Sequence, residues 1–143
     1  MSGTQGFRLT KSRRQVRDRI QALRDGAQDA LASAVIVGAR AMDDELERAV
    51  TKTGWHRMLT RAGGRPGRHD TGNMVSKIRT NAKHPSVTPD RITMAFGWFA
   101  GEFETYFKLQ ELGTGTIPAA HSLVEGSAAA RVELMRGLRQ VVR

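Results

Sequence analysis

The N-terminal third of the chain repeats apolar residues at the spacing of an amphipathic helix. From Ser12, a suitable N-cap, apolar or small side chains recur every three or four residues. They are Val16, Ile20, Leu23, Ala27, Ala30, Leu31, Ala34, Val35, Gly38, Met42, Leu46 and Val50. Residues 1–11 lack this periodicity and are predicted to form a flexible arm. Gly26 either divides the helix or weakens it by about 1 kcal/mol relative to alanine.

Strict alternation of apolar and other residues follows at 91–98. Ile92, Met94, Phe96 and Trp98 alternate with Arg91, Thr93, Ala95 and Gly97. This period of two predicts a strand with one buried face. The preceding segment 81–90 contains two prolines and is predicted to be a turn, and residues 103–112 are compatible with either a strand or a short helix.

Helical spacing returns near the C-terminus, where a helix is predicted from about Ser122 to Val142. Its predicted buried face has apolar residues three to four positions apart. They are Leu123, Val124, Ala128, Val132, Met135 and Leu138. Since the 143 residues contain 39% hydrophobic and 6% aromatic side chains, we expect a single domain with a small core that depends partly on neighbouring chains.

Candidate chemistry is sparse. The chain has no cysteine, which excludes disulfides, zinc–thiolate sites and thiol catalysis. Its four histidines lack metal-ligand spacing, and no serine lies in a nucleophile elbow. Residues 113–116 (GTGT) are too short for a phosphate loop and predict a turn. We therefore expect no enzyme activity, cofactor or metal, and the short apolar runs indicate no membrane span.

Charge is distributed in blocks along the chain. Residues 1–25 carry seven basic and two acidic side chains, and residues 52–91 carry nine basic and two acidic ones. In contrast, residues 26–51 carry two basic and five acidic side chains, and residues 92–143 carry five of each. The polar side of the N-terminal helix thus changes sign along its length. An ordinary solvated face is the favoured interpretation, and packing between neighbouring subunits in a ring is the alternative.

Two groups of arginines are candidates for binding a polyanion. One is in the predicted helix, at Arg13, Arg14 and Arg17, and the other is in the Gly/Pro/Arg loop at 61–70, at Arg61, Arg65 and Arg68. We expect the loop to be mobile in an isolated subunit. One interpretation is contact with the DNA backbone in a pore. The alternative, which is equally favoured, is an exposed basic loop or a loop that docks on an acidic partner ring. No sequence-reading DNA motif accompanies the arginines.

The order of motifs over residues 27–140 resembles the head–tail joining family of siphophages, also called neck, tail-completion or minor tail-component proteins. The resemblance includes the segment 70–74 (DTGNM) and the Gly97–Trp98 pair. The most specific part is a tyrosine followed by Glu-Leu-Gly-Thr and Ile-Pro-Ala, formed by Tyr106, Glu111, Leu112, Gly113, Thr114, Ile117, Pro118 and Ala119. The family usually continues with a proline and an aromatic residue, where this chain has His121, Ser122 and Leu123.

The resemblance implies an α+β fold, in which a long N-terminal helix and a C-terminal helix pack on a small antiparallel β-sheet within a single domain at 12–143. It also implies a structural virion protein that forms a homo-oligomeric ring of six or twelve subunits in the neck, after assembly in the host cytoplasm. The implied partners are adjacent connector, stopper, terminator or tail-tube proteins, with packaged DNA in the lumen. Residues 111–114 are then expected first to form a turn that orients the C-terminal helix, and second to contact a neighbouring subunit, as are Tyr106 and Pro118.

Two further expectations complete this interpretation. Conspicuous aromatic residues, Trp55 and Trp98 among them, are candidates for burial against neighbouring subunits. The alternative function is that of a small protein that binds nucleic acid without sequence specificity, and its basis is the two basic blocks.

Overall fold

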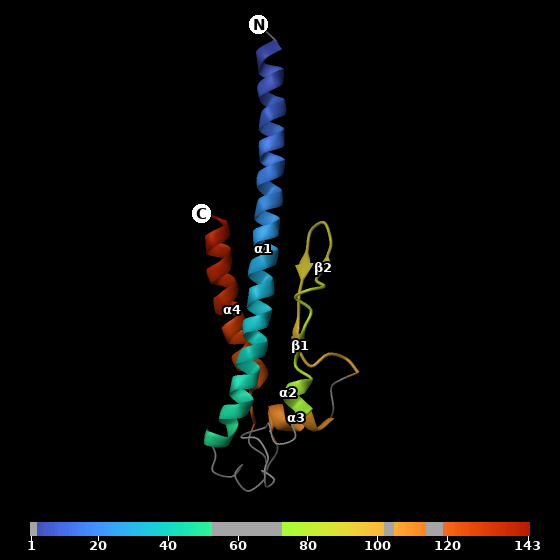
Figure 1. The fold of residues 1–143 in the computed structure, drawn as a ribbon, viewed down its shortest axis with the longest axis vertical. Coiled ribbons are helices and arrows are strands. Elements are labelled where there is room, and N and C mark those ends of the chain that lie inside the picture. The colour runs from blue at the N-terminus through green and yellow to red at the C-terminus, as the bar shows by residue number, and fades with distance from the viewer. Residues whose placement is uncertain (1–2, 53–72, 102–104, 114–118) are drawn as a thin grey trace.

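One long helix, α1 (Gly3–Lys52), runs along the whole length of the molecule (Figure 1). At 1.5 Å per residue, its 50 residues span about 75 Å. The computed structural model describes residues 3–52, 73–101, 105–113 and 119–143. The fold is α+β, as expected, with a long N-terminal helix and a C-terminal helix packed on small antiparallel strands.

The elements after α1 are short, except for the C-terminal helix. They are α2 (Asn73–Ser76), β1 (Arg79–Thr80), β2 (Ser86–Val87), β3 (Ile92–Thr93), β4 (Phe96–Gly97), α3 (Thr105–Leu112) and α4 (Ser122–Val141). The segment that is compatible with strand or helix is therefore helical from Thr105. The predicted turn at 81–90 contains the strand β2.

The start of α1 differs from the sequence prediction. Residues 3–11 are helical, whereas the sequence predicts a flexible arm there. These residues include no proline, and extending an existing helix costs much less than nucleating a new one. Gly26 does not divide α1 either, because the helix continues through it.

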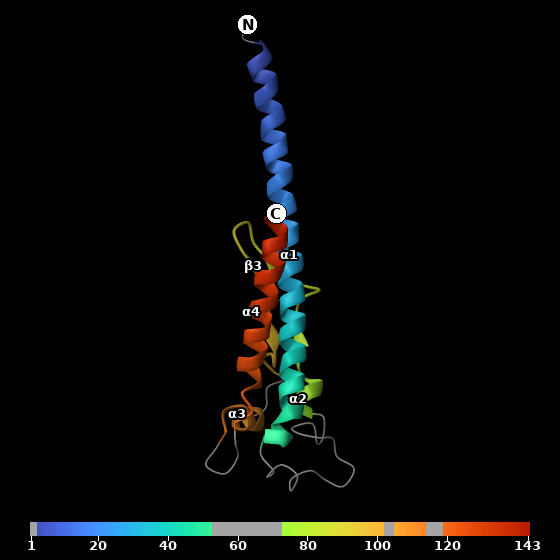
Figure 2. The ribbon, with the colours of Figure 1, turned by 90° about the vertical axis from the view of Figure 1, so that its left-hand side faces the viewer.

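Small residues form the contact between α1 and α4. The two helices lie antiparallel, with α4 alongside the half of α1 that is nearer its C-terminal end (Figures 1 and 2). A Cβ atom added to Gly137 would lie 2.7 Å from the Cβ of Ala30, and one added to Gly126 would lie 2.8 Å from the carbonyl oxygen of Gly38. Both distances are too short for carbon in a folded protein, so the two backbones approach closely because side chains are missing.

The strands form a narrow ribbon on the other side of α1. β1 pairs with β4 and β2 pairs with β3, both antiparallel. Between the two ladders, the backbone N–H of Ala95 donates to Oδ1 of Asn81 at 2.6 Å, and the N–H of Asn81 donates to the Ala95 carbonyl at 3.2 Å. The predicted strand at 91–98 is therefore interrupted at residues 94–95. The predicted one-sided burial holds for 91–96, where Ile92, Met94 and Phe96 are half-buried and the residues between them are exposed. It fails at Gly97, which is buried although the alternation places it on the exposed face.

Phe96 links the ribbon to both long helices. Its ring atoms come within 2.7 Å of the position that a Cβ on Gly38 would occupy, and within 2.9 Å of the position of one on Gly126. The ring thus lies in a notch that exists because α1 and α4 each have a glycine there. One aromatic side chain fixes the position of β4 against the helix pair.

The core of the described residues is small. Its fully or nearly buried apolar side chains are Ala30, Ala34, Val35, Met42, Leu46, Met74, Phe107 and Ala120. Three of these eight are alanines, which bury little area on folding. At about 25 cal/mol per Å² of apolar surface, such a core contributes less than one built from larger aliphatic and aromatic side chains.

The buried face of α4 is not the one that the sequence predicts. Val124, Val132 and Met135 are 62%, 71% and 48% exposed, although all three belong to the predicted buried face. Gly126 and Gly137 contact α1 instead. A hydrophobic pattern marks the bulky residues of a helix, but a close contact between helices selects the small ones. The prediction therefore identified the helix correctly and its buried face wrongly.

We expect Gly126→Ala and Gly137→Ala each to lower the free energy of unfolding by about 1–3 kcal/mol, because the added methyl group forces the helices apart. Alanine favours a helix over glycine by about 1 kcal/mol, so intrinsic propensity alone predicts the opposite sign. Urea denaturation measures the change. Ser127→Ala on the exposed side of α4 is the control and should not destabilise. Stabilisation by Gly137→Ala would contradict the close contact.

Candidate functional site

Glu111 connects α3 to the start of α4. Its carboxylate is buried, with the residue 6% exposed. Oε1 accepts the backbone N–H of Leu123 at 2.7 Å, and Oε2 accepts the hydroxyl of Ser122 at 2.6 Å. The backbone N–H of His121 also donates to the carbonyl of Glu111 at 3.2 Å. Three hydrogen bonds thus fix the beginning of α4 to this one residue.

This arrangement replaces an ordinary N-cap. The N-cap position of α4 is His121, with φ of 55° and no capping hydrogen bond from its side chain. A left-handed backbone is unusual for a residue other than glycine. The Glu111 carboxylate instead receives a free N–H of the first turn, at the end of the helix where a negative charge is favourable. Glu111 and Leu112 belong to α3, whereas the sequence predicts a turn from residue 111. The helix ends at Gly113, whose φ of 77° lets the chain reverse.

A small aromatic cluster lies at the same end of the molecule. Trp98 and Phe107 have ring centroids 5.4 Å apart, and Nε1 of Trp98 donates to the Met74 carbonyl at 2.8 Å. Phe107 is fully buried and packs with Leu46 and Met74. The structure therefore gives the indole of Trp98 partners within its own chain.

The other residues singled out in the sequence fall into two groups. Tyr106 and Leu112 lie in α3, where Leu112 is exposed. Arg13, Arg14 and Arg17 are exposed on the part of α1 that extends beyond the end of α4 (Figure 1). The remaining candidates lie outside the described residues. They are Trp55, Arg61, Arg65, Arg68, Thr114 and Pro118.

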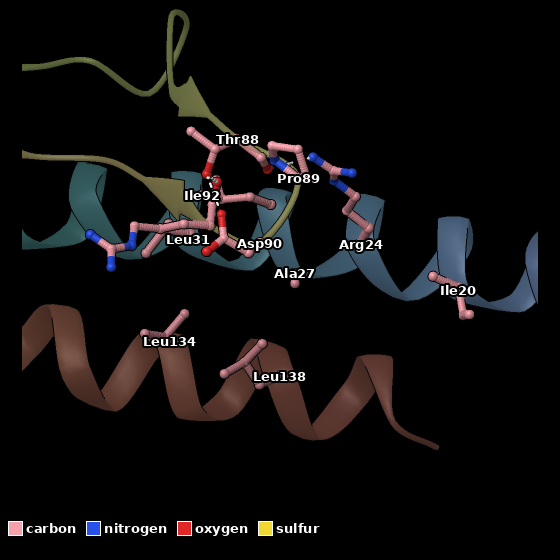
Figure 3. Close-up of a pocket in the computed structure, with 11 residues that line it drawn as sticks. Ile20, Arg24, Ala27, Leu31, Thr88, Pro89, Asp90, Ile92, Leu134 and Leu138 are labelled. Atoms are coloured by element: carbon pink, nitrogen blue, oxygen red, sulfur yellow. Dashed lines mark hydrogen bonds between the residues drawn. The ribbon is translucent and has the colours of Figure 1, made fainter.

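A groove of about 570 Å³ lies where α1, α4 and the β2–β3 hairpin meet (Figure 3). Its walls are mostly aliphatic, from Ile20, Ala27 and Leu31 of α1 and Leu134 and Leu138 of α4. At its rim, Nη2 of Arg24 donates to the Thr88 carbonyl at 2.9 Å, which ties the hairpin tip to α1.

The groove has few groups suited to chemistry. Its polar lining residues are Arg24, Thr88, Asp90 and Arg91. The Thr88 hydroxyl lies 2.9 Å from Oδ1 of Asp90, so these two side chains satisfy each other. Within the described residues, no group of three or more histidine, cysteine, aspartate or glutamate side chains is placed to hold a metal ion. The groove is suited to covering apolar surface rather than to binding a charged substrate.

A polar contact within the small-residue interface joins α1 to α4. The hydroxyl of Ser33 donates to Oε1 of Glu133 at 2.8 Å, and Arg136 binds the same carboxylate at 2.6 and 2.9 Å. The hydrogen bond from Arg136, followed by the one from Ser33, lowers the pKa of Glu133 below its usual 4.5. Its carboxylate in turn raises the pKa of Arg136. Both charges therefore persist at neutral pH.

Exposed apolar side chains lie on the outer sides of the two long helices. On α4 they are Val124, Val132, Met135 and Val142, and on α1 it is Ile36, whereas the exposed Ile20 lines the groove. The sequence predicts most of these as core. On α1 the predicted face does include the residues that contact α4, and the four-residue spacing of Gly26, Ala30, Ala34 and Gly38 was the signal for a close helix contact there.

Comparisons of the chain with protein-family models, with curated proteins and with solved structures find no match. In the part of the chain that the structure describes, no helix is long and apolar enough to cross a membrane.

We expect Glu111→Ala to lower the free energy of unfolding by about 2–3 kcal/mol, because it leaves the start of α4 without its acceptor in a buried position. Glu111→Gln keeps one acceptor oxygen and should cost less. Thermal unfolding followed by circular dichroism compares the two. Exposed Glu125, in the first turn of α4, is the matched control, and Glu125→Ala should cost less than about 1 kcal/mol. Equal effects at 111 and 125 would contradict the capping role.

Proposed function

We propose that this chain is a non-enzymatic structural subunit of the neck of a tailed bacteriophage, where a ring of its copies joins the DNA-filled head to the tail. The observation that carries the proposal is the exposed apolar outer face of α4, at Val124, Val132 and Met135. A group of exposed apolar side chains along a helix is typical of a surface that another chain covers. The described residues of one chain cover the inner side.

The small core supports the same function. A chain that buries few large side chains within itself and exposes several on its longest helices gains stability by burying them against other chains. Repeated contacts around a closed ring add up, although each contact is modest. Such a ring performs a mechanical task, which is to hold packaged DNA and bind the next ring of the neck.

The assignment to the neck, rather than to any other assembly, rests on the motif order in the sequence. Glu111 belongs to the most specific of these motifs, and its carboxylate anchors α4, the helix with the exposed apolar face. The residue that belongs to this motif therefore also positions the proposed assembly surface. The proposed partners are further copies of this chain and the adjacent connector, stopper, terminator or tail-tube proteins of the virion.

Particles assembled without this chain should contain full heads and separate tails that do not join. Negative-stain electron microscopy of lysates from a deletion strain, with the wild-type chain supplied in trans as control, tests this expectation. Normal tailed and infectious particles in the deletion strain would refute the proposed function.

A second candidate function, binding of nucleic acid without sequence specificity, is favoured by one observation. Arg13, Arg14 and Arg17 are exposed on the N-terminal part of α1, which extends away from the rest of the fold (Figure 1). Such an arm is accessible to the phosphates of a duplex. In a neck ring the same arginines are available to the packaged DNA or to an acidic neighbour.

Salt titration of duplex DNA binding separates the two functions. If the chain is a neck subunit, we expect the isolated protein to bind DNA weakly at physiological salt. Any binding at low salt should fall by about 0.9 log units per log unit of salt for each phosphate contact. Replacing Arg13, Arg14 and Arg17 by alanine should remove it, whereas replacing the exposed Lys83, Arg91 and Lys108 should have less effect. Tight binding at physiological salt would favour the second function.

A further inference from the structure

Two exposed helical faces of this chain carry opposite net charge, and each also has apolar side chains. The first, the α4 outer face, consists of Val124, Ala128, Arg131, Val132, Met135 and Arg139. The second, the α1 outer face, consists of Asp25, Asp29, Ile36, Arg40, Asp44 and Glu47. All twelve residues are exposed. One face is apolar with two arginines, and the other has an exposed isoleucine with four acidic residues and Arg40, which leaves it with a net negative charge.

We infer that the α4 outer face of one copy docks on the α1 outer face of the next copy, head to tail. This inference rests on the proposed function and specifies the contact that builds the ring. Val132 and Met135 would cover Ile36, and Arg131 and Arg139 would lie near acidic residues such as Asp29 and Glu47. The occupant of the α4 outer face is therefore a second copy of this chain.

Spacing along the helices supports this pairing. On α1, Asp25, Asp29, Ile36, Arg40 and Glu47 are separated by four, seven, four and seven residues, which places them on one side of the helix. On α4, Val124, Ala128, Arg131 and Met135 follow at intervals of four, three and four residues. The α1 outer face is about 33 Å long and the α4 outer face about 22 Å from residue 124 to 139, so the longer can accommodate the shorter.

The two faces are also available at the same time. The residues that hold α1 against α4 within one chain are different ones, namely Gly26, Ala30, Ser33 and Gly38 on α1 and Gly126, Glu133 and Gly137 on α4. One copy can therefore present its α4 outer face to one neighbour and its α1 outer face to another. This is the requirement for a heterologous interface, which forms a closed ring if the rotation between copies closes.

Charge disfavours the symmetric alternative. If two α4 outer faces paired with each other, Arg131 and Arg139 of both copies would enter one interface, and like charges brought together oppose association. The N-terminal basic part of α1 is a poor partner for the α4 outer face for the same reason. Among the described surfaces of the chain, the acidic α1 outer face offers the opposite charge together with an apolar side chain.

Cysteine crosslinking tests the pairing directly, because the native chain has no cysteine. Two single variants, Ile36→Cys and Val132→Cys, are purified, mixed and treated with a short bismaleimide. The mixture should give a covalent dimer at least tenfold more efficiently than either variant alone. A chain with both substitutions should give a ladder of oligomers that stops at the size of the ring. Val87→Cys on the exposed hairpin, mixed with Val132→Cys, is the control and should not crosslink.

Charge reversal provides the second arm of the test. Arg131→Glu with Arg139→Glu in the Val132→Cys chain should reduce the crosslink yield at least tenfold. Asp29→Arg with Glu47→Arg in the Ile36→Cys chain should restore it. All these positions are exposed, and circular dichroism of each variant checks that it is folded. Lack of rescue, or crosslinking of Val132→Cys with itself in preference to Ile36→Cys, would overturn the head-to-tail pairing. Absence of any crosslink between positions 36 and 132 would overturn it as well.

Failure of this inference can be distinguished from failure of the proposed function. A crosslinked ladder together with normal tailed particles in the deletion strain would retain the interface and reject the neck function. Tailless particles in the deletion strain, with no crosslink between positions 36 and 132 in assembled wild-type-like virions, would retain the function and reject this interface.

Discussion

The close contact between α1 and α4 is the constraint on which the rest of the structure depends. Gly126 and Gly137 lie against Gly38 and Ala30, at distances that leave no room for a side chain on α4. The same missing side chains create the notch that receives the ring of Phe96. The position of the β-ribbon thus depends on the spacing of the helices, and that spacing depends on a few small residues in α1 and α4.

Packing through small residues determines which apolar side chains stay exposed on α4. Because the inner side of α4 is small, its larger residues, such as Val132 and Met135, lie on the opposite side and stay exposed in the single chain. A contact between small residues brings backbones close together but buries little apolar area per residue. The fold therefore leaves several large apolar side chains exposed on the single chain, and this property is the one we connect with the proposed assembly.

The hydrogen bonds of Glu111 fix the orientation of α4. A buried carboxylate in α3 accepts hydrogen bonds from the first turn of α4, while Ser33 and Glu133 join the two long helices further along. These polar contacts lie at separate points on α4, so the helix is fixed in direction as well as in distance. The ring that we propose would need a fixed α4 orientation, because a heterologous contact closes a ring only if the rotation from one copy to the next is well defined.

The sequence alone determined the long N-terminal helix, the C-terminal helix and the alternating burial of residues 91–96, because apolar periodicity of 3.6 or two residues is a local property. It did not determine the inner face of α4, since the pattern marks Val132 as core and gives no sign that Gly126 and Gly137 face α1. It also gave no indication that Glu111 would cap a helix beginning eleven residues later. Those features were decided by the tertiary structure, because they depend on how closely two distant segments approach, and that distance is set jointly by residues far apart in the chain.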